Sequence, residues 1–120
     1  MKPYYVQTKP FIVPTNDGKL IEEHFGKASV EDGDFSFAHM VAPAGWTETF
    51  QTPDFDEITY VIKGRKKVEI EGEEIVLETN QSLSIKKGIR VRYSNPYDEP
   101  AEYISFCVPA FTVDRAHRED

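Results

Sequence analysis

Short runs of alternating apolar and polar residues, broken by turn-forming residues, extend along almost the whole chain. Residues 35–41 are the clearest case, with one face made of Phe35, Phe37, His39 and Val41 and the other of Ser36, Ala38 and Met40. A period of two side chains is typical of a β-strand. No window of ten or more residues has the helical period. The pattern therefore predicts an all-β fold with little helix.

Turn signals separate the other strand-like runs, which span residues 11–13, 20–21, 58–62, 68–70, 75–77, 82–85, 90–94 and 102–108. The residues around Gly72 predict a hairpin between two of these runs. Many short strands with turns about every 8–12 residues indicate a sandwich or a barrel. The charged segment 114–120 is expected to be a turn, a tail or one turn of helix. The apolar N-terminal strands are candidates for pairing with a second subunit, which would cover an open sheet edge.

The charge and cysteine content exclude several classes of protein. A formal net charge of -7 argues against nucleic acid or an anionic membrane surface as a partner. The basic run 65–67 is interpreted as a solvated strand edge. Cys107 is the single cysteine, so no internal disulfide requires an oxidising compartment. The N-terminus lacks the apolar run of a signal peptide, and no stretch is long and apolar enough to span a membrane. A cytoplasmic protein is the expectation.

The segment 45–64 carries a pattern that points to a known family. Gly45, Glu57 and Gly64 stand at the spacing of the pattern G-x5-H-x-H-x3-E-x6-G, while Gln51 and Pro53 replace its two histidines. This arrangement resembles the first motif of the cupin superfamily. The resemblance implies that the glycines form the turns of a barrel and that the glutamate points into it.

A second, more altered pattern follows at residues 80–95. Gly88 and Asn95 match the second cupin motif, G-x5-P-x-G-x2-H-x3-N. Asn80 replaces the first glycine, and asparagine also tolerates the left-handed backbone of a tight turn. Lys86 replaces the proline and Val91 replaces the third histidine. Together the two motifs resemble those of a small single-domain cupin with degenerate metal-binding positions.

The resemblance implies a double-stranded β-helix, the jelly-roll barrel of RmlC-like cupins. It places a single domain at residues 1–120, with the barrel core at about residues 35–108. It also implies a homodimer and a small-molecule ligand in the barrel.

The family's metal positions fall on Gln51, Pro53, Glu57 and Val91. Only Glu57 is a good ligand, whereas a divalent metal needs about three protein ligands. We therefore expect no metal at these positions and no other cofactor. An alternative is an unorthodox site for a divalent metal, built from His39, Gln51 and Glu57.

Strand alternation predicts which side chains line the cavity. The resemblance directs Glu57 into the barrel, and strand alternation together with the motif positions then directs other side chains inward as well. The predicted cavity lining is His39, Gln51, Glu57, Tyr93, Tyr103 and Cys107. His39, Glu57 and Tyr93 are the candidate general acids and bases. Gln51, Tyr103, Cys107 and Trp46 are candidate ligand contacts, and Trp46 could also cap the barrel mouth or pack a dimer contact.

Each of these residues also has a structural interpretation. His39 could be a hydrogen-bonded core histidine, and Cys107 a small buried apolar residue. The functional hypotheses are a metal-independent isomerase or lyase, a non-catalytic module that binds a polar or sugar-like ligand, and a structural or regulatory protein with a filled barrel. The fold by itself does not separate them, and the identity of the ligand is beyond the sequence.

Overall fold

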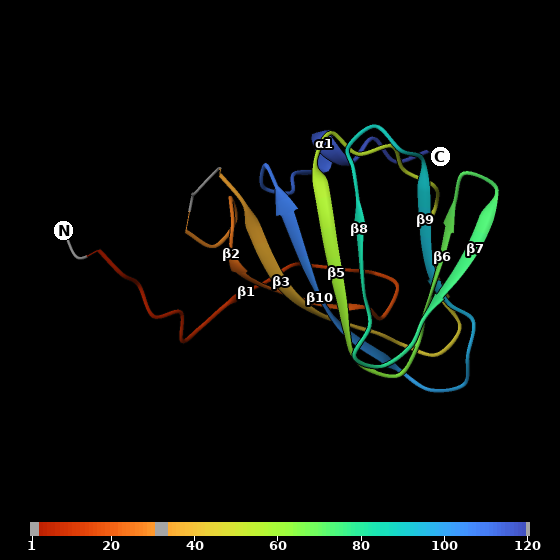
Figure 1. The fold of residues 1–120 in the computed structure, drawn as a ribbon. Coiled ribbons are helices and arrows are strands. Elements are labelled where there is room, and N and C mark those ends of the chain that lie inside the picture. The colour runs from red at the N-terminus through yellow and green to blue at the C-terminus, as the bar shows by residue number, and fades with distance from the viewer. Residues whose placement is uncertain (1–2, 31–33, 120) are drawn as a thin grey trace.

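The computed structural model describes residues 3–30 and 34–119, and Figure 1 shows two sheets that face each other. The larger sheet has the strand order β1-β2-β3-β10-β5-β8, and the smaller has the order β4-β9-β6-β7. The strands are β1 (Phe11–Ile12), β2 (Leu20–Phe25), β3 (Ser36–Ala42), β4 (Trp46–Thr47), β5 (Asp56–Lys63), β6 (Lys66–Ile70), β7 (Glu73–Leu77), β8 (Ser82–Ile85), β9 (Val91–Asn95) and β10 (Ala101–Val108). The all-β jelly-roll prediction is confirmed.

Glycine and asparagine make the tight turns that the sequence predicts. Ile70 pairs with Glu73, so Glu71 and Gly72 form a two-residue hairpin loop between β6 and β7, and both have positive φ. This is the geometry of a type I′ turn. Asn80 has φ of 70°, which confirms its predicted left-handed turn. These turns connect consecutive strands at the ends of the sheets.

Alternation along the strands directs one set of side chains between the sheets. On β5, Thr59 and Val61 are buried while Ile58 and Tyr60 are exposed. On β10 the buried set is Ala101, Tyr103, Ser105 and Cys107. An apolar cluster that includes Trp46, Val61, Val68 and Val91 fills part of the space between the sheets and extends to Tyr93 and Tyr103.

The C-terminal segment closes one side of the barrel. Thr112 caps the short helix α1 (Val113–Ala116) by accepting a hydrogen bond from the Arg115 amide. Beyond the helix, Arg118 forms an isolated β-bridge with Gln51. The helical alternative predicted for 114–120 is therefore confirmed in part, although Asp120 lies outside the described residues. Among the described residues, no helix has the length and apolar character needed to cross a bilayer.

Candidate functional site

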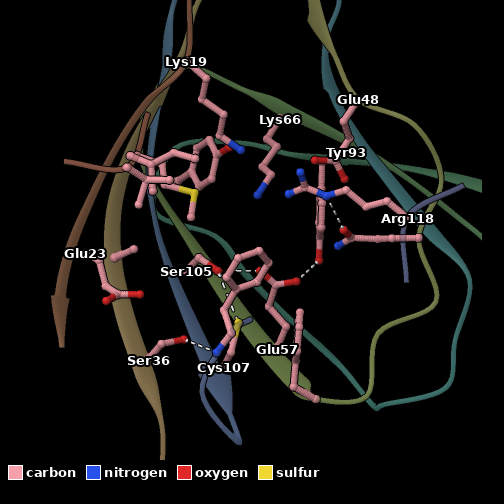
Figure 2. A pocket seen from close by; sticks show the side chains of 18 residues that line it. Lys19, Glu23, Ser36, Glu48, Glu57, Lys66, Tyr93, Ser105, Cys107 and Arg118 are labelled. Carbon is pink, nitrogen blue, oxygen red and sulfur yellow. Dashed lines mark hydrogen bonds between the residues drawn. The ribbon is translucent and has the colours of Figure 1, made fainter. Parts of the chain in front are cut away.

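A cavity of about 70 Å³ lies between the two sheets, beside the apolar cluster. Because one water takes up about 30 Å³ in the liquid, the cavity has room for only a few water-sized groups. Figure 2 shows charged side chains converging on this space from several elements. The ionisable acids and bases in its lining include Lys19, Glu23, Glu48, Glu57, Lys66 and Arg118. Burying this many charged groups between the sheets costs stability unless each of them has a partner.

Glu57 is the hydrogen-bonded acid of the cavity. It points inward from β5 and is only 9% exposed. Its Oε1 accepts a hydrogen bond from the Tyr93 hydroxyl at 2.7 Å, and its Oε2 accepts one from the Ser105 hydroxyl. Both carboxylate oxygens are therefore partnered, which offsets the cost of burying the charge.

Lys66 is the buried base of the cavity. It is 2% exposed, and its Nζ donates a hydrogen bond to Thr59 Oγ1 at 3.1 Å. Nζ also lies 4.0 Å from the ring centroid of Tyr93 and 3.6 Å from that of Tyr103. Burial lowers the pKa of Lys66 to about 7, although the charge of Glu57 partly opposes this. The amine therefore exists in both protonation states near neutral pH.

The phenols and the thiol stay protonated in this environment. Burial and the neighbouring carboxylates raise the pKa of Tyr93 and of Tyr103 well above the usual value for a phenol. Burial also raises the pKa of Cys107, with Glu57 adding to the effect. Cys107 is thus a neutral thiol that contacts Ser105 (Oγ···Sγ 3.8 Å) and is unsuited to act as a nucleophile.

Most of the residues predicted to line the cavity do so. Gln51, Glu57, Tyr93, Tyr103 and Cys107 all contribute to its lining. Their placement follows from the strand period, because one inward residue fixes its neighbours two positions away. What each does with a ligand stays a prediction.

The predicted placement of His39 is wrong. His39 lies on the outer face of β3, where Nδ1 contacts Glu22 at 2.7 Å and Nε2 contacts Glu102 at 2.6 Å. The buried face of this strand is that of Ser36 and Ala38. The opposite face, which carries Phe37 and His39, points away from the cavity. Aromatic residues pack on that outer side, where the ring centroids of Phe35 and Phe106 are 5.7 Å apart. His39 is therefore removed from the candidate catalytic set.

Trp46 does not line the cavity, so its position does not support the predicted ligand contact. Its side chain is 6% exposed and belongs to the apolar cluster, and it is not part of the cavity lining. The indole Nε1 donates to Asp17 at 2.8 Å, and Lys19 Nζ lies 4.2 Å from the ring centroid. Trp46 thus supports Lys19, which does line the cavity, instead of contacting a ligand itself.

Sequence reasoning missed several charged residues of the site. Lys66 was assigned to a solvated strand edge, but it alternates with the buried Val68 on β6, and that period could have revealed its inward direction. Lys19 stands directly before β2 and lines the cavity with Ile21 and Glu23, so the period of two could have revealed its direction as well. Glu48 and Arg118 come from segments without a strand period, and no local signal in the sequence points them at the cavity.

The residues at the family's metal positions do not fit a divalent cation. Pro53 and Val91 offer no side-chain donor, and Glu57 already accepts two hydrogen bonds. The alternative set of His39, Gln51 and Glu57 fails as well, because His39 lies on the far side of the sheet. Within residues 3–30 and 34–119, no group of three or more His, Cys, Asp or Glu side chains is arranged to hold a metal ion.

Comparisons with known sequences identify a family and one longer relative. The family model described as Cupin domain matches residues 38–107. The chain is 37% identical over 108 residues to a Myxococcus xanthus protein named endoribonuclease YbeY. The match covers 90% of this chain and 37% of that protein, so the chain spans little more than a third of the relative's length.

Comparisons with solved structures find the same fold at low sequence identity. An RmlC-like cupin from Shewanella frigidimarina aligns with a TM-score of 0.73 at 14% identity, covering 92% of this chain and 93% of the other. Streptomyces PAC13, solved with uridine, aligns with a TM-score of 0.76 at 14% identity, covering 100% and 92%. KdgF from Halomonas sp. aligns with a TM-score of 0.74 at 16% identity, covering 95% and 98%. At these identities the likeness is one of fold.

Proposed function

Because the chain belongs to the cupin domain family and keeps a charged cavity in its barrel, we propose that it binds a small polar molecule there and acts on it by metal-independent acid–base chemistry, as an isomerase or lyase. The observation that carries the proposal is the hydrogen-bonded set of Glu57, Tyr93 and Ser105 beside the buried amine of Lys66. General acid–base catalysis needs groups whose protonation states differ and that lie within reach of one ligand.

Each residue of this set has a chemical task. Lys66 has a pKa of about 7, so its neutral form takes a proton from the ligand and its charged form returns one. Tyr93 stays protonated and donates a hydrogen bond to an oxygen of the ligand or of Glu57. Glu57 fixes the orientation of Tyr93, and its charge favours the protonated form of Lys66 against the effect of burial. If the proton is taken from one ligand atom and returned to a neighbouring atom, the reaction is an isomerisation. If removal of the proton is followed by loss of a leaving group, the reaction is an elimination.

A binding module without turnover is the second candidate function. The charged lining of the cavity is as suitable for binding a polar ligand as for acting on it. The two functions differ in whether Lys66 and Glu57 transfer protons to and from the bound molecule. A filled, structural barrel is disfavoured by the cavity itself.

The test is hydrogen exchange in a panel of small molecules. Protein treated with a chelator is incubated in D₂O with uridine, glucose, glucuronate or glycerate, and proton NMR follows carbon-bound hydrogen and any product. We expect exchange or conversion of at least one compound, reduced by a factor on the order of 100 or more in Lys66→Met and in Glu57→Gln. Uridine is included because it was solved with PAC13.

Lys67→Met is the matched control for Lys66→Met. Lys67 is the next residue on β6 but pairs with Glu74 at 3.1 Å outside the cavity, so this variant should keep the wild-type rate. Binding of a panel compound with no exchange would identify a binding module instead. Activity that disappears with the chelator and returns with a metal would reject the metal-independent reaction.

A further inference from the structure

Three cationic side chains reach one region of the cavity from distant parts of the chain. Lys19 precedes β2, Lys66 begins β6, and Arg118 follows α1. Figure 2 shows their charged ends directed into the same space. Within the described residues, none of the three has a carboxylate oxygen within ion-pair distance. Positive charge is therefore gathered here without direct neutralisation.

The contacts that these cations do make are with neutral groups. Lys19 Nζ lies over the ring of Trp46 at 4.2 Å and that of Tyr103 at 5.3 Å. Arg118 Nε donates a long hydrogen bond of 3.5 Å to Gln51 Oε1. Burial lowers the pKa of Lys19. A buried amine is harder to protonate when no anion lies close enough to replace its lost hydration.

The described carboxylates around the cavity are not in direct contact with the three cations. Glu23 is held away from the cations, because its Oε2 accepts from the backbone amides of Ala28 and Ser29. Glu48, Glu57 and Asp17 are the acids whose charges act on the lysines, but none of them forms an ion pair with the three cations among the described residues. An anionic ligand in the cavity would give these cations a partner at contact distance.

Two buried polar atoms of the same lining have no partner among the described residues. They are the Tyr103 hydroxyl and Glu48 Oε2. Tyr103 is 1% exposed, so water outside the barrel cannot satisfy it. Buried polar groups in native proteins are nearly always hydrogen-bonded. One of these atoms offers a proton and the other accepts one, which defines the chemistry of a missing partner.

We infer that the cavity binds a small hydroxycarboxylate, whose carboxylate is held by Lys19, Arg118 and the Tyr103 hydroxyl. A hydroxyl of the same ligand donates to Glu48 Oε2. Glycerate and lactate are among the smallest hydroxycarboxylates, as a cavity of about 70 Å³ requires. The inference rests on the proposed function, since it names the ligand class for the same cavity, and it leaves the hydrogen-bonded set around Glu57 for the reaction.

The test compares each acid with a neutral molecule of the same shape. Binding to the purified protein is measured by calorimetry and by thermal unfolding for glycerate against glycerol and for lactate against propanediol. We expect dose-dependent stabilisation by the acids and none by the neutral molecules. Lys19→Met should weaken the binding of glycerate at least about tenfold, because a buried charge contact is lost.

Tyr103→Phe is the most discriminating variant. It removes only the unpartnered hydroxyl, so without ligand the variant should unfold at the wild-type temperature or above, while glycerate binding weakens about tenfold. Tyr60→Phe is the matched control, because that hydroxyl bonds Asn80 on the outer surface and binding should not change. Equal binding of glycerol, no binding of either acid, or full glycerate affinity in both Lys19→Met and Tyr103→Phe would overturn the inference.

The inference and the proposed function fail in different ways. Glu57→Gln should abolish hydrogen exchange yet keep glycerate affinity within about threefold, since Glu57 is not assigned to the carboxylate. If a neutral compound exchanges hydrogen and neither acid binds, the hydroxycarboxylate inference is overturned, while the proposed acid–base reaction is supported. If glycerate binds tightly and no panel compound exchanges hydrogen, the hydroxycarboxylate inference is supported and the proposed acid–base reaction is overturned.

Discussion

His39 forms a hydrogen-bonded bridge across three strands of the outer surface. Its two ring nitrogens contact Glu22 on β2 and Glu102 on β10. Burial by itself would lower the pKa of His39, but the hydrogen bonds to Glu102 and Glu22 outweigh it and raise the pKa. A protonated imidazole can donate to both carboxylates at once, which a neutral ring cannot. His39 is thus a pH-dependent structural link in the larger sheet.

The bridge predicts that stability depends on pH through His39. A raised folded-state pKa contributes stability that is complete below the unfolded pKa, about 6.5, and is lost as the pH rises through the folded value. His39→Gln should therefore be less stable than wild type by up to about 1 kcal/mol near pH 6. The difference should shrink towards about pH 9. Urea unfolding at both pH values measures it.

His24→Gln serves as the control for this experiment. The His24 ring packs against Phe37, and no carboxylate within residues 3–30 and 34–119 forms an ion pair with it, so this variant should keep the wild-type pH dependence. A constant difference between His39→Gln and wild type at both pH values would contradict the predicted role.

The turn between β5 and β6 shows why the second glycine of the motif is required. Gly64 has φ of 81°, and a Cβ at this position would lie 2.5 Å from the Pro100 carbonyl oxygen. Gly72, in the loop between β6 and β7, has φ of 79° with nothing within 4 Å of a Cβ. The two glycines therefore share a backbone conformation and differ in their surroundings. Gly64 allows the turn to pack against the start of β10.

This comparison predicts different costs for two alanine substitutions. Gly72→Ala should cost about 1–2 kcal/mol, the strain of a left-handed backbone. Gly64→Ala should lose roughly 1–3 kcal/mol more, because the clash is with backbone that cannot rotate away. Chemical denaturation of both variants measures the difference. Equal losses would show that the contact with Pro100 relaxes without cost.

At the scale of elements, the sequence predicted most of the strands and their inward faces. The period of two fixed Tyr103 and Cys107 on one side of β10, and the motif fixed the direction of Glu57 on β5. The face of β3 could not be predicted in the same way, because both of its faces carry apolar residues. The interior there is lined by the small Ser36 and Ala38, whereas reasoning from hydrophobicity assumes that the larger apolar set is inside.

At the scale of the whole molecule, the outer face of the larger sheet exposes several apolar side chains. Phe37, Phe106 and Ile58 lie side by side across β3, β10 and β5 in the sheet register. Phe37 and Ile58 are exposed. Figure 1 shows the N-terminal segment extending away from the barrel, and Tyr5 and Val6 within it are also exposed. Exposed apolar side chains clustered on one face are typical of a contact surface.

The expected homodimer stays a prediction, and this face is where we place it. Sedimentation velocity over a range of concentrations should show a dimer for the wild type and a monomer for the double variant Phe37→Glu, Ile58→Glu, because buried unpaired charge opposes association. Val76→Glu is the matched control, since Val76 is exposed on β7 of the smaller sheet. A wild-type monomer at every concentration would reject the prediction.

The sequence by itself determined the architecture and part of the cavity. Alternation, turn residues and the two motifs gave the jelly roll and turned Gln51, Glu57, Tyr93, Tyr103 and Cys107 inward. These properties are local, because each depends on strand period or on backbone conformation at a few positions. Only the tertiary structure brought Lys19, Glu48 and Arg118 to Lys66, and only it placed His39 outside. Those placements depend on how strands distant in sequence pair and on how loops close over the barrel, which no local pattern records.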